Sequence, residues 1–76
     1  MQRTEETEAI REWLNVDFFS RDQIARLAGI NRATGFNIAR GQNIPLPKTI
    51  DRFKEAAVVR REALLTELNI LERVLK

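Results

Sequence analysis

Hydrophobic positions recur at three- and four-residue intervals along most of this chain, which is the spacing of one face of an α-helix. In the N-terminal part, Ile10, Trp13 and Leu14 fall on one such face. They predict an amphipathic first helix that begins near Thr4 or Thr7 and packs inward. We expect Trp13 in the core, because a domain this small needs the buried area of its aromatic side chains.

A second short helix is predicted over residues 21–28, where apolar residues again repeat at helical spacing. Ser20 is a suitable N-cap, and Gln23 three residues later completes a capping box. Gly29 follows, and glycine adopts the left-handed conformation that ends a helix without a Cβ penalty. We therefore expect this helix to stop at Gly29.

A third helix is predicted over residues 32–40, directly after the glycine turn. Asn31 is a favourable N-cap for this helix, and Gly41 supplies a second stop. Two short helices that share such a tight turn form a helix-turn-helix, and this geometry presents the second helix outward. A helix presented in this way typically enters the major groove of DNA.

The C-terminal part of the chain predicts one long helix. The loop over residues 41–47 contains two prolines, of which Pro47 fits the first turn of a helix. Residues 48–76 then contain neither glycine nor proline. We therefore predict an all-α fold of four to five helices, with a helix-turn-helix domain over residues 1–57 and a helical extension over residues 58–76.

Leucines in the extension recur with a seven-residue period that is typical of a coiled-coil seam, in which Arg61 is the polar exception. This seam predicts a homodimer; the alternative is a helix that turns near residues 58–60 and folds back on its own core. We favour the dimer because no residue in that stretch encourages a turn. Parallel and antiparallel pairing both fit the pattern. The predicted interface residues are Leu64, Leu65, Leu68, Leu71 and Leu75.

The composition narrows the chemistry that the protein can perform. Its 76 residues include no cysteine and no histidine, which excludes disulfides and thiolate metal sites and removes the commonest general base. We therefore expect no enzyme, no metal, no cofactor and no small-molecule ligand. No apolar run approaches the ~18 residues of a membrane span, and the acidic N-terminus lacks the apolar stretch of a signal peptide. These features predict a cytoplasmic protein without a membrane partner.

The net charge of +2 is unevenly distributed along the chain. Residues 1–30 carry four basic and six acidic side chains, and residues 55–76 carry four of each. Residues 31–54 carry five basic side chains against Asp51 alone, which gives +4. The positive charge is thus concentrated on the predicted third helix and the segment after it, as expected of a surface that meets a polyanion.

The motif residues resemble the lambda-repressor/Cro-like (XRE-like) helix-turn-helix family over residues 18–57, about half of the chain. A small residue, a turn glycine four positions later, an apolar residue and a polar cap stand in the order of the family. The resemblance implies a DNA-binding regulator from a bacterium or a phage. The positions that carry it are Ala25, Gly29, Ile30, Asn31, Ile38, Gly41 and the proline-containing loop at residues 45–50.

One residue departs from the family pattern. Gly35 stands at a core position of the third helix where the family normally has valine or isoleucine. Glycine there is expected to leave a gap and to cost about 1 kcal/mol relative to alanine. Two interpretations of the next residue follow: Phe36 fills the gap, or it faces the DNA groove.

The predicted DNA contacts fall into two groups. Base contacts are expected from the start and outer face of the third helix, where arginine suits guanine, asparagine suits adenine and small apolar groups suit the thymine methyl. These residues are Arg32, Ala33, Thr34, Phe36 and Asn37. Phosphate contacts are expected from the start of the second helix and from the region after the third. They are Ser20, Arg21, Gln23, Arg40, Gln42, Asn43 and Lys48.

Two functions fit this sequence. The first is a sequence-specific DNA-binding transcriptional regulator, a repressor or an activator, which binds double-stranded operator DNA as a homodimer through its third helix. The second is a protein-interaction module, antitoxin-like or antirepressor-like, in which the long helix binds a partner protein. The ordered motif, the basic segment and the C-terminal seam favour the first. Gly35, the acidic first helix and the small net charge favour the second.

Overall fold

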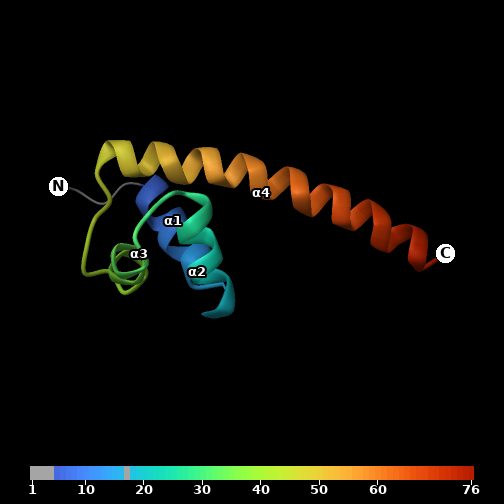
Figure 1. The fold of residues 1–76 in the computed structure, drawn as a ribbon, viewed down its shortest axis with the longest axis horizontal. Coiled ribbons are helices and arrows are strands. Elements are labelled where there is room, and N and C mark those ends of the chain that lie inside the picture. The colour runs from blue at the N-terminus through green and yellow to red at the C-terminus, as the bar shows by residue number, and fades with distance from the viewer. Residues whose placement is uncertain (1–4, 17) are drawn as a thin grey trace.

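The computed structural model describes residues 5–16 and 18–76, with the backbone only at Phe18 and Phe19. These residues form four α-helices and no strand, so the predicted all-α fold is confirmed. In Figure 1 the first three helices form a bundle beneath the first half of the fourth, whose second half extends away from the bundle. The helices are α1 (Glu5–Leu14), α2 (Phe18–Leu27), α3 (Arg32–Ala39) and α4 (Pro47–Val74).

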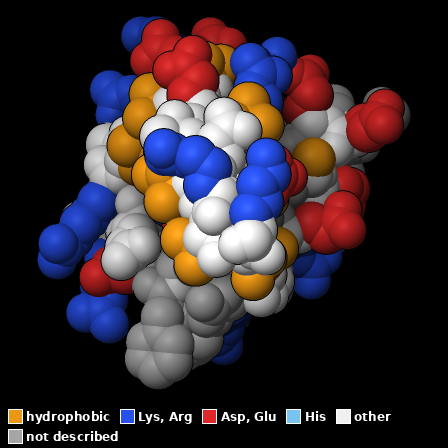
Figure 2. All heavy atoms as spheres, turned by 90° about the vertical axis from the view of Figure 1, so that its right-hand side faces the viewer, with side chains coloured by type: hydrophobic (Ala, Val, Ile, Leu, Met, Phe, Trp, Pro, Cys, Tyr) orange, Lys and Arg blue, Asp and Glu red, His pale blue; other side chains and the backbone are white. Residues whose placement is uncertain are grey.

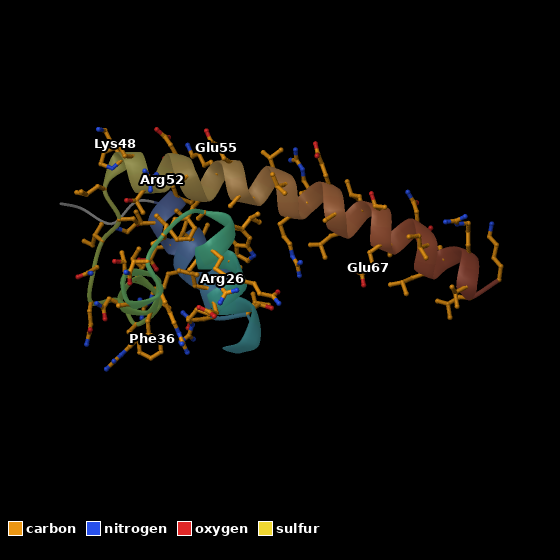
Figure 3. The ribbon with its side chains drawn as sticks, viewed as in Figure 1. Arg26, Phe36, Lys48, Arg52, Glu55 and Glu67 are labelled. Carbon is orange, nitrogen blue, oxygen red and sulfur yellow. The ribbon has the colours of Figure 1, made fainter. Side chains whose placement is uncertain are left out.

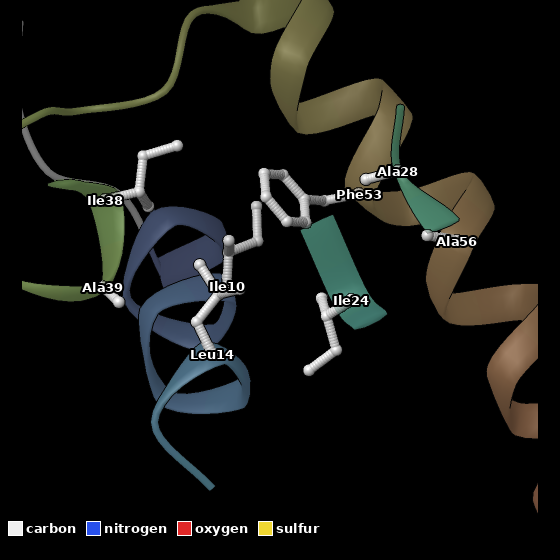
Figure 4. Close-up of a cluster of buried hydrophobic side chains, with 8 residues drawn as sticks. All are labelled: Ile10, Leu14, Ile24, Ala28, Ile38, Ala39, Phe53 and Ala56. Carbon is white, nitrogen blue, oxygen red and sulfur yellow. The ribbon is translucent and has the colours of Figure 1, made fainter. Parts of the chain in front are cut away.

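One small hydrophobic core holds the bundle together. Phe53 of α4 and Leu14 of α1 are its largest fully buried side chains, with 1 % and 0 % of their surface exposed. Figure 4 shows the Phe53 ring reaching from α4 toward α1 and α2. Trp13 is partly buried and packs against this core, as predicted. The first three helices each contribute one buried isoleucine, namely Ile10, Ile24 and Ile38.

α1 begins at Glu5, the residue after Thr4, so of the two predicted starts the one near Thr4 is confirmed; Thr4 itself lies outside the described residues. Thr7, the other candidate, is buried inside the helix and is not its cap. The predicted start of α2 is wrong. α2 begins two residues before Ser20, so the predicted capping box does not start this helix. The reason is tertiary. Arg21 Nε donates to the Leu14 carbonyl oxygen at 3.0 Å, which holds the start of α2 close to the end of α1.

The turn between α2 and α3 has the predicted structure. Gly29 follows α2 with a φ of +69°, in the left-handed region that favours glycine. The Ala33 amide donates to Asn31 Oδ1 at 2.8 Å, so Asn31 caps α3. Gly41 follows α3 with a φ of +78°. The two short helices, their glycine turn and the second glycine stop are therefore confirmed.

α4 is a single unbroken helix with Pro47 in its first turn, as predicted. The helix continues through residues 58–60, so the alternative in which it turns there and folds back on its own core is wrong. Its last buried residue is Ala56, and residues 57–76 are all exposed. Among the helices of the described part of the chain, none is long and apolar enough to cross a membrane.

Two polar contacts connect the first half of α4 to the bundle. Arg52 donates to the Gly29 carbonyl oxygen at 3.2 Å, which ties α4 to the turn before α3. Lys54 forms an ion pair with Glu6 of α1, and the hydrogen bond and negative charge of this carboxylate raise the pKa of Lys54. Both contacts are exposed and contribute little to stability. The position of α4 therefore depends mainly on the burial of Phe53.

Candidate nucleic-acid interface

α3 packs directly against α2 at a glycine. Gly35 is buried, and a Cβ added to it would lie 3.1 Å from the Ala25 Cβ, which is tighter than nine in ten real contacts of this kind. The predicted gap at Gly35 is therefore wrong, because the missing side chain is what lets the two helices approach. This contact sets the position of α3 on α2, and it leaves no space that Phe36 would need to fill.

The predicted base-contact residues lie on α3, which Figure 3 shows at the side of the bundle away from α4. The Arg32 side chain at the start of this helix is 84 % exposed and forms a long ion pair with Asp22 of α2, with 3.6 Å between Nε and the nearer carboxylate oxygen. An exposed pair of this length constrains the guanidinium weakly. Of the five residues, Asn37 is half-buried and four are exposed: Arg32, Ala33, Thr34 and Phe36.

Phe36 stands between two arginines on the outer face of α3. The residue is 39 % exposed, and its ring points away from the core in Figure 3. The guanidinium carbon of Arg21 lies 5.3 Å from the ring centroid, and that of Arg40 lies 5.2 Å from it. Both distances are those of a cation–π contact. Of the two interpretations of Phe36, the structure supports the outward-facing ring and contradicts core filling.

A hydrogen-bond network joins the C-terminal end of α3 to the end of α1. Arg21 donates to the Leu14 carbonyl oxygen at 3.0 Å and to Asn15 Oδ1 at 2.8 Å. The Asn15 side-chain amide donates to the Ala39 carbonyl oxygen at 2.9 Å, and Arg11 Nε donates to the same oxygen at 3.4 Å. Arg21 is thus a structural link between helices as well as a cation beside an exposed ring.

The loop after α3 folds back over the end of that helix. The Asn37 carbonyl oxygen accepts the backbone N–H groups of Gln42 at 2.9 Å and of Asn43 at 3.3 Å. These bonds hold the two polar side chains of the loop near Arg40, which follows the last residue of α3. The C-terminal end of α3 therefore carries a compact group of hydrogen-bond donors.

Of the predicted phosphate-contact residues, the structure brings Arg21 and Arg40 to the flanks of Phe36, whereas Lys48 lies elsewhere. Figure 3 shows Lys48, at the start of α4, on the opposite side of the molecule from Phe36. Lys48 is separated from the others because α4 crosses the far side of the bundle. The remaining predicted phosphate contacts are Ser20 and Gln23 on α2, and Gln42 and Asn43 in the loop after α3.

The described residues hold no group of three acidic side chains that could bind a metal ion. No family model, no curated protein and no solved structure significantly matches the chain. The resemblance to the lambda-repressor/Cro-like family remains a prediction from the motif residues. Its local features, the Gly29 turn and the Asn31 cap, are present in the structure.

Proposed function

We propose that this protein is a sequence-specific DNA-binding regulator that places α3 in the major groove and binds operator DNA as a homodimer. The observation that carries the proposal is the position of Phe36 between the guanidinium groups of Arg21 and Arg40. An exposed ring with a cation on each side suits a surface that meets base edges at its centre and phosphates at its margins. Arg32, exposed at the start of α3, supplies the side chain best suited to guanine.

Arg32→Ala is expected to lower the affinity for a selected DNA site by about 1–3 kcal/mol and to relax the base preference at one position, because a bidentate contact with guanine is lost. Arg73→Ala is the matched control, since it removes the same charge from the exposed end of α4. Binding is measured by fluorescence anisotropy on duplexes selected from a random library. A palindromic selected site would also indicate two-fold symmetry.

This experiment has two outcomes that contradict DNA recognition through α3. In the first, no selected duplex binds better than random DNA. In the second, the two arginine variants lose the same affinity on every duplex, which would indicate a general effect of charge. Urea unfolding of both variants checks that neither substitution acts through stability.

Phe36→Ala is expected to abolish a preference for thymine over uracil at one position of the selected site. Apolar side chains contact the thymine methyl in the major groove, and uracil differs from thymine only by lacking this methyl. Each thymine is replaced in turn by uracil, and binding is compared for the wild type, Phe36→Ala and the apolar control Phe36→Leu. If both Phe36 variants keep the full discrimination, the methyl contact belongs to another residue.

One observation favours the second function, a protein-interaction module of the antitoxin or antirepressor type. The second half of α4 exposes a row of large apolar side chains, including Leu64, Leu68 and Leu71 at 47–50 % exposure. Such a row is typical of a surface that another helix covers. This function would be favoured over DNA binding if the chain is monomeric, binds none of the selected duplexes and co-purifies with a different protein.

A further inference from the structure

The exposed apolar row of α4 forms a seam that begins beside the bundle and continues to the end of the helix. At the end nearer the bundle, a hollow of about 450 Å³ is lined by Trp13 of α1 and by α4 side chains as far as Leu68. Figure 2, seen from the C-terminal side, shows hydrophobic side chains exposed between charged ones. The seam consists of Ala57, Arg61, Leu64, Leu68, Leu71 and Leu75.

We infer that a second copy of this chain covers the seam, and that the two α4 helices pair in antiparallel orientation. In this register Leu64 lies level with the partner's Leu68, and the two-fold axis crosses α4 at the height of Thr66. The inference rests on the homodimer of the proposed function, and it does not depend on DNA binding. The charges along the seam and the place of Trp13 support it independently.

A parallel in-register pair would oppose like charges at three places. With Ala57, Leu64 and Leu71 at heptad position d, Arg61 occupies position a, where each residue meets its own copy in a parallel pair. Arg61 would therefore face the partner's Arg61 inside the seam. Glu67 at position g would face the partner's Glu72 at position e, and symmetry repeats this repulsion. Juxtaposed like charges disfavour an association.

The antiparallel pair replaces most of these repulsions by attractions. In this orientation a residues meet d residues, so Arg61 lies level with the partner's Leu71 and next to the partner's Glu72 on the same flank of the seam. Symmetry gives two such Arg–Glu pairs. The arginine stem covers apolar surface while its charged end reaches the carboxylate. One repulsion remains, between Glu67 and the partner's Glu67 across the two-fold axis.

Trp13 gives a second reason for the antiparallel orientation. Because Trp13 lines the end of the seam nearer the bundle, a parallel partner would bring its own α1–α3 bundle to that end, and the two bundles would meet there. An antiparallel partner brings the end of its α4 instead. The partner's Leu75 then lies level with Ala57 and covers the hollow beside Trp13. Each copy thus covers exposed apolar surface at both ends of the other.

Single-cysteine variants distinguish the two orientations, because the chain has no cysteine of its own. Glu67→Cys places the two thiols on the same flank near the two-fold axis of the antiparallel pair. Leu71→Cys places them ten residues apart along that pair, about 15 Å, whereas it places them face to face in a parallel pair. Thr66→Cys, on the outward side of α4, measures random cross-linking. All three positions are exposed in the single chain, so folding is retained.

Each full-length variant is treated with a short bismaleimide without DNA, and covalent dimers are quantified by denaturing electrophoresis. We expect Glu67→Cys to cross-link well above Thr66→Cys, and Leu71→Cys to remain at the level of Thr66→Cys. Stronger cross-linking of Leu71→Cys than of Glu67→Cys would overturn the antiparallel orientation and leave the homodimer intact. If all three variants cross-link only at the level of Thr66→Cys, and sedimentation shows a monomer, both the antiparallel orientation and the homodimer are overturned. DNA recognition by Arg32 is tested separately, by the binding experiment with Arg32→Ala.

Discussion

Replacing Phe53 with alanine is expected to lower the free energy of unfolding by about 3–5 kcal/mol. Phe53 is 1 % exposed, and its ring is the one large aromatic group that the buried core of the described residues contains. A 76-residue domain is expected to have a total stability of about 4–11 kcal/mol. The substitution therefore removes a large share of that stability, because it leaves a cavity where α4 meets α1 and α2. Urea denaturation followed by circular dichroism measures the change.

Val59→Ala is the matched control for Phe53→Ala. Val59 lies on the same helix, beyond the last buried residue, and is 52 % exposed. Its truncation is expected to change the stability by no more than about 0.5 kcal/mol. Equal losses from the two variants would contradict a core centred on Phe53, because alanine has the higher helical propensity at both positions and the change at Val59 removes no buried contact.

The features predicted correctly from the sequence are those that depend on neighbouring residues. A positive φ at Gly29 and the cap at Asn31 follow from the chemistry of one residue and its next few neighbours. The same is true of Pro47 in the first turn of α4 and of the unbroken helix after it. Such local preferences can be predicted from a single sequence because they do not depend on how the helices pack.

The features that sequence reasoning missed depend on contacts between distant residues. Asn15 and Arg11 support the end of α3 through the Ala39 carbonyl, over separations of 24 and 28 residues. Nothing in the local pattern marks such a pair. The sequence predicts Lys48 as a phosphate contact because it lies beside the loop after the third helix, yet the path of α4 takes it to the other side of the bundle. The early start of α2 has the same origin, since it depends on how Arg21 meets the end of α1.

Gly35 shows how the meaning of a residue depends on the distance between two helices. From the sequence alone, a glycine at a core position predicts a gap and a loss of helical propensity. In the structure Ala25 already occupies the space beside this glycine, because its Cβ lies within contact distance of the position that a Cβ on residue 35 would take. The sequence alone predicts that a larger residue at position 35 stabilises the protein by filling a cavity. The structure predicts the opposite, because the larger residue would overpack the contact between α2 and α3.

Gly35→Val is accordingly expected to destabilise the protein by about 1–3 kcal/mol, although valine has the better helical propensity. The added carbons would overlap Ala25, so α3 must move away from α2, and this also shifts Arg32 and Phe36 relative to DNA. A double-mutant cycle with Ala25→Gly measures the contact by urea unfolding, and binding to the selected duplex reports the shift of α3. We expect the double variant to be more stable than the sum of the single changes, by about 0.5–3 kcal/mol. If the two costs simply add, the approach of α2 and α3 is not what requires glycine at this position.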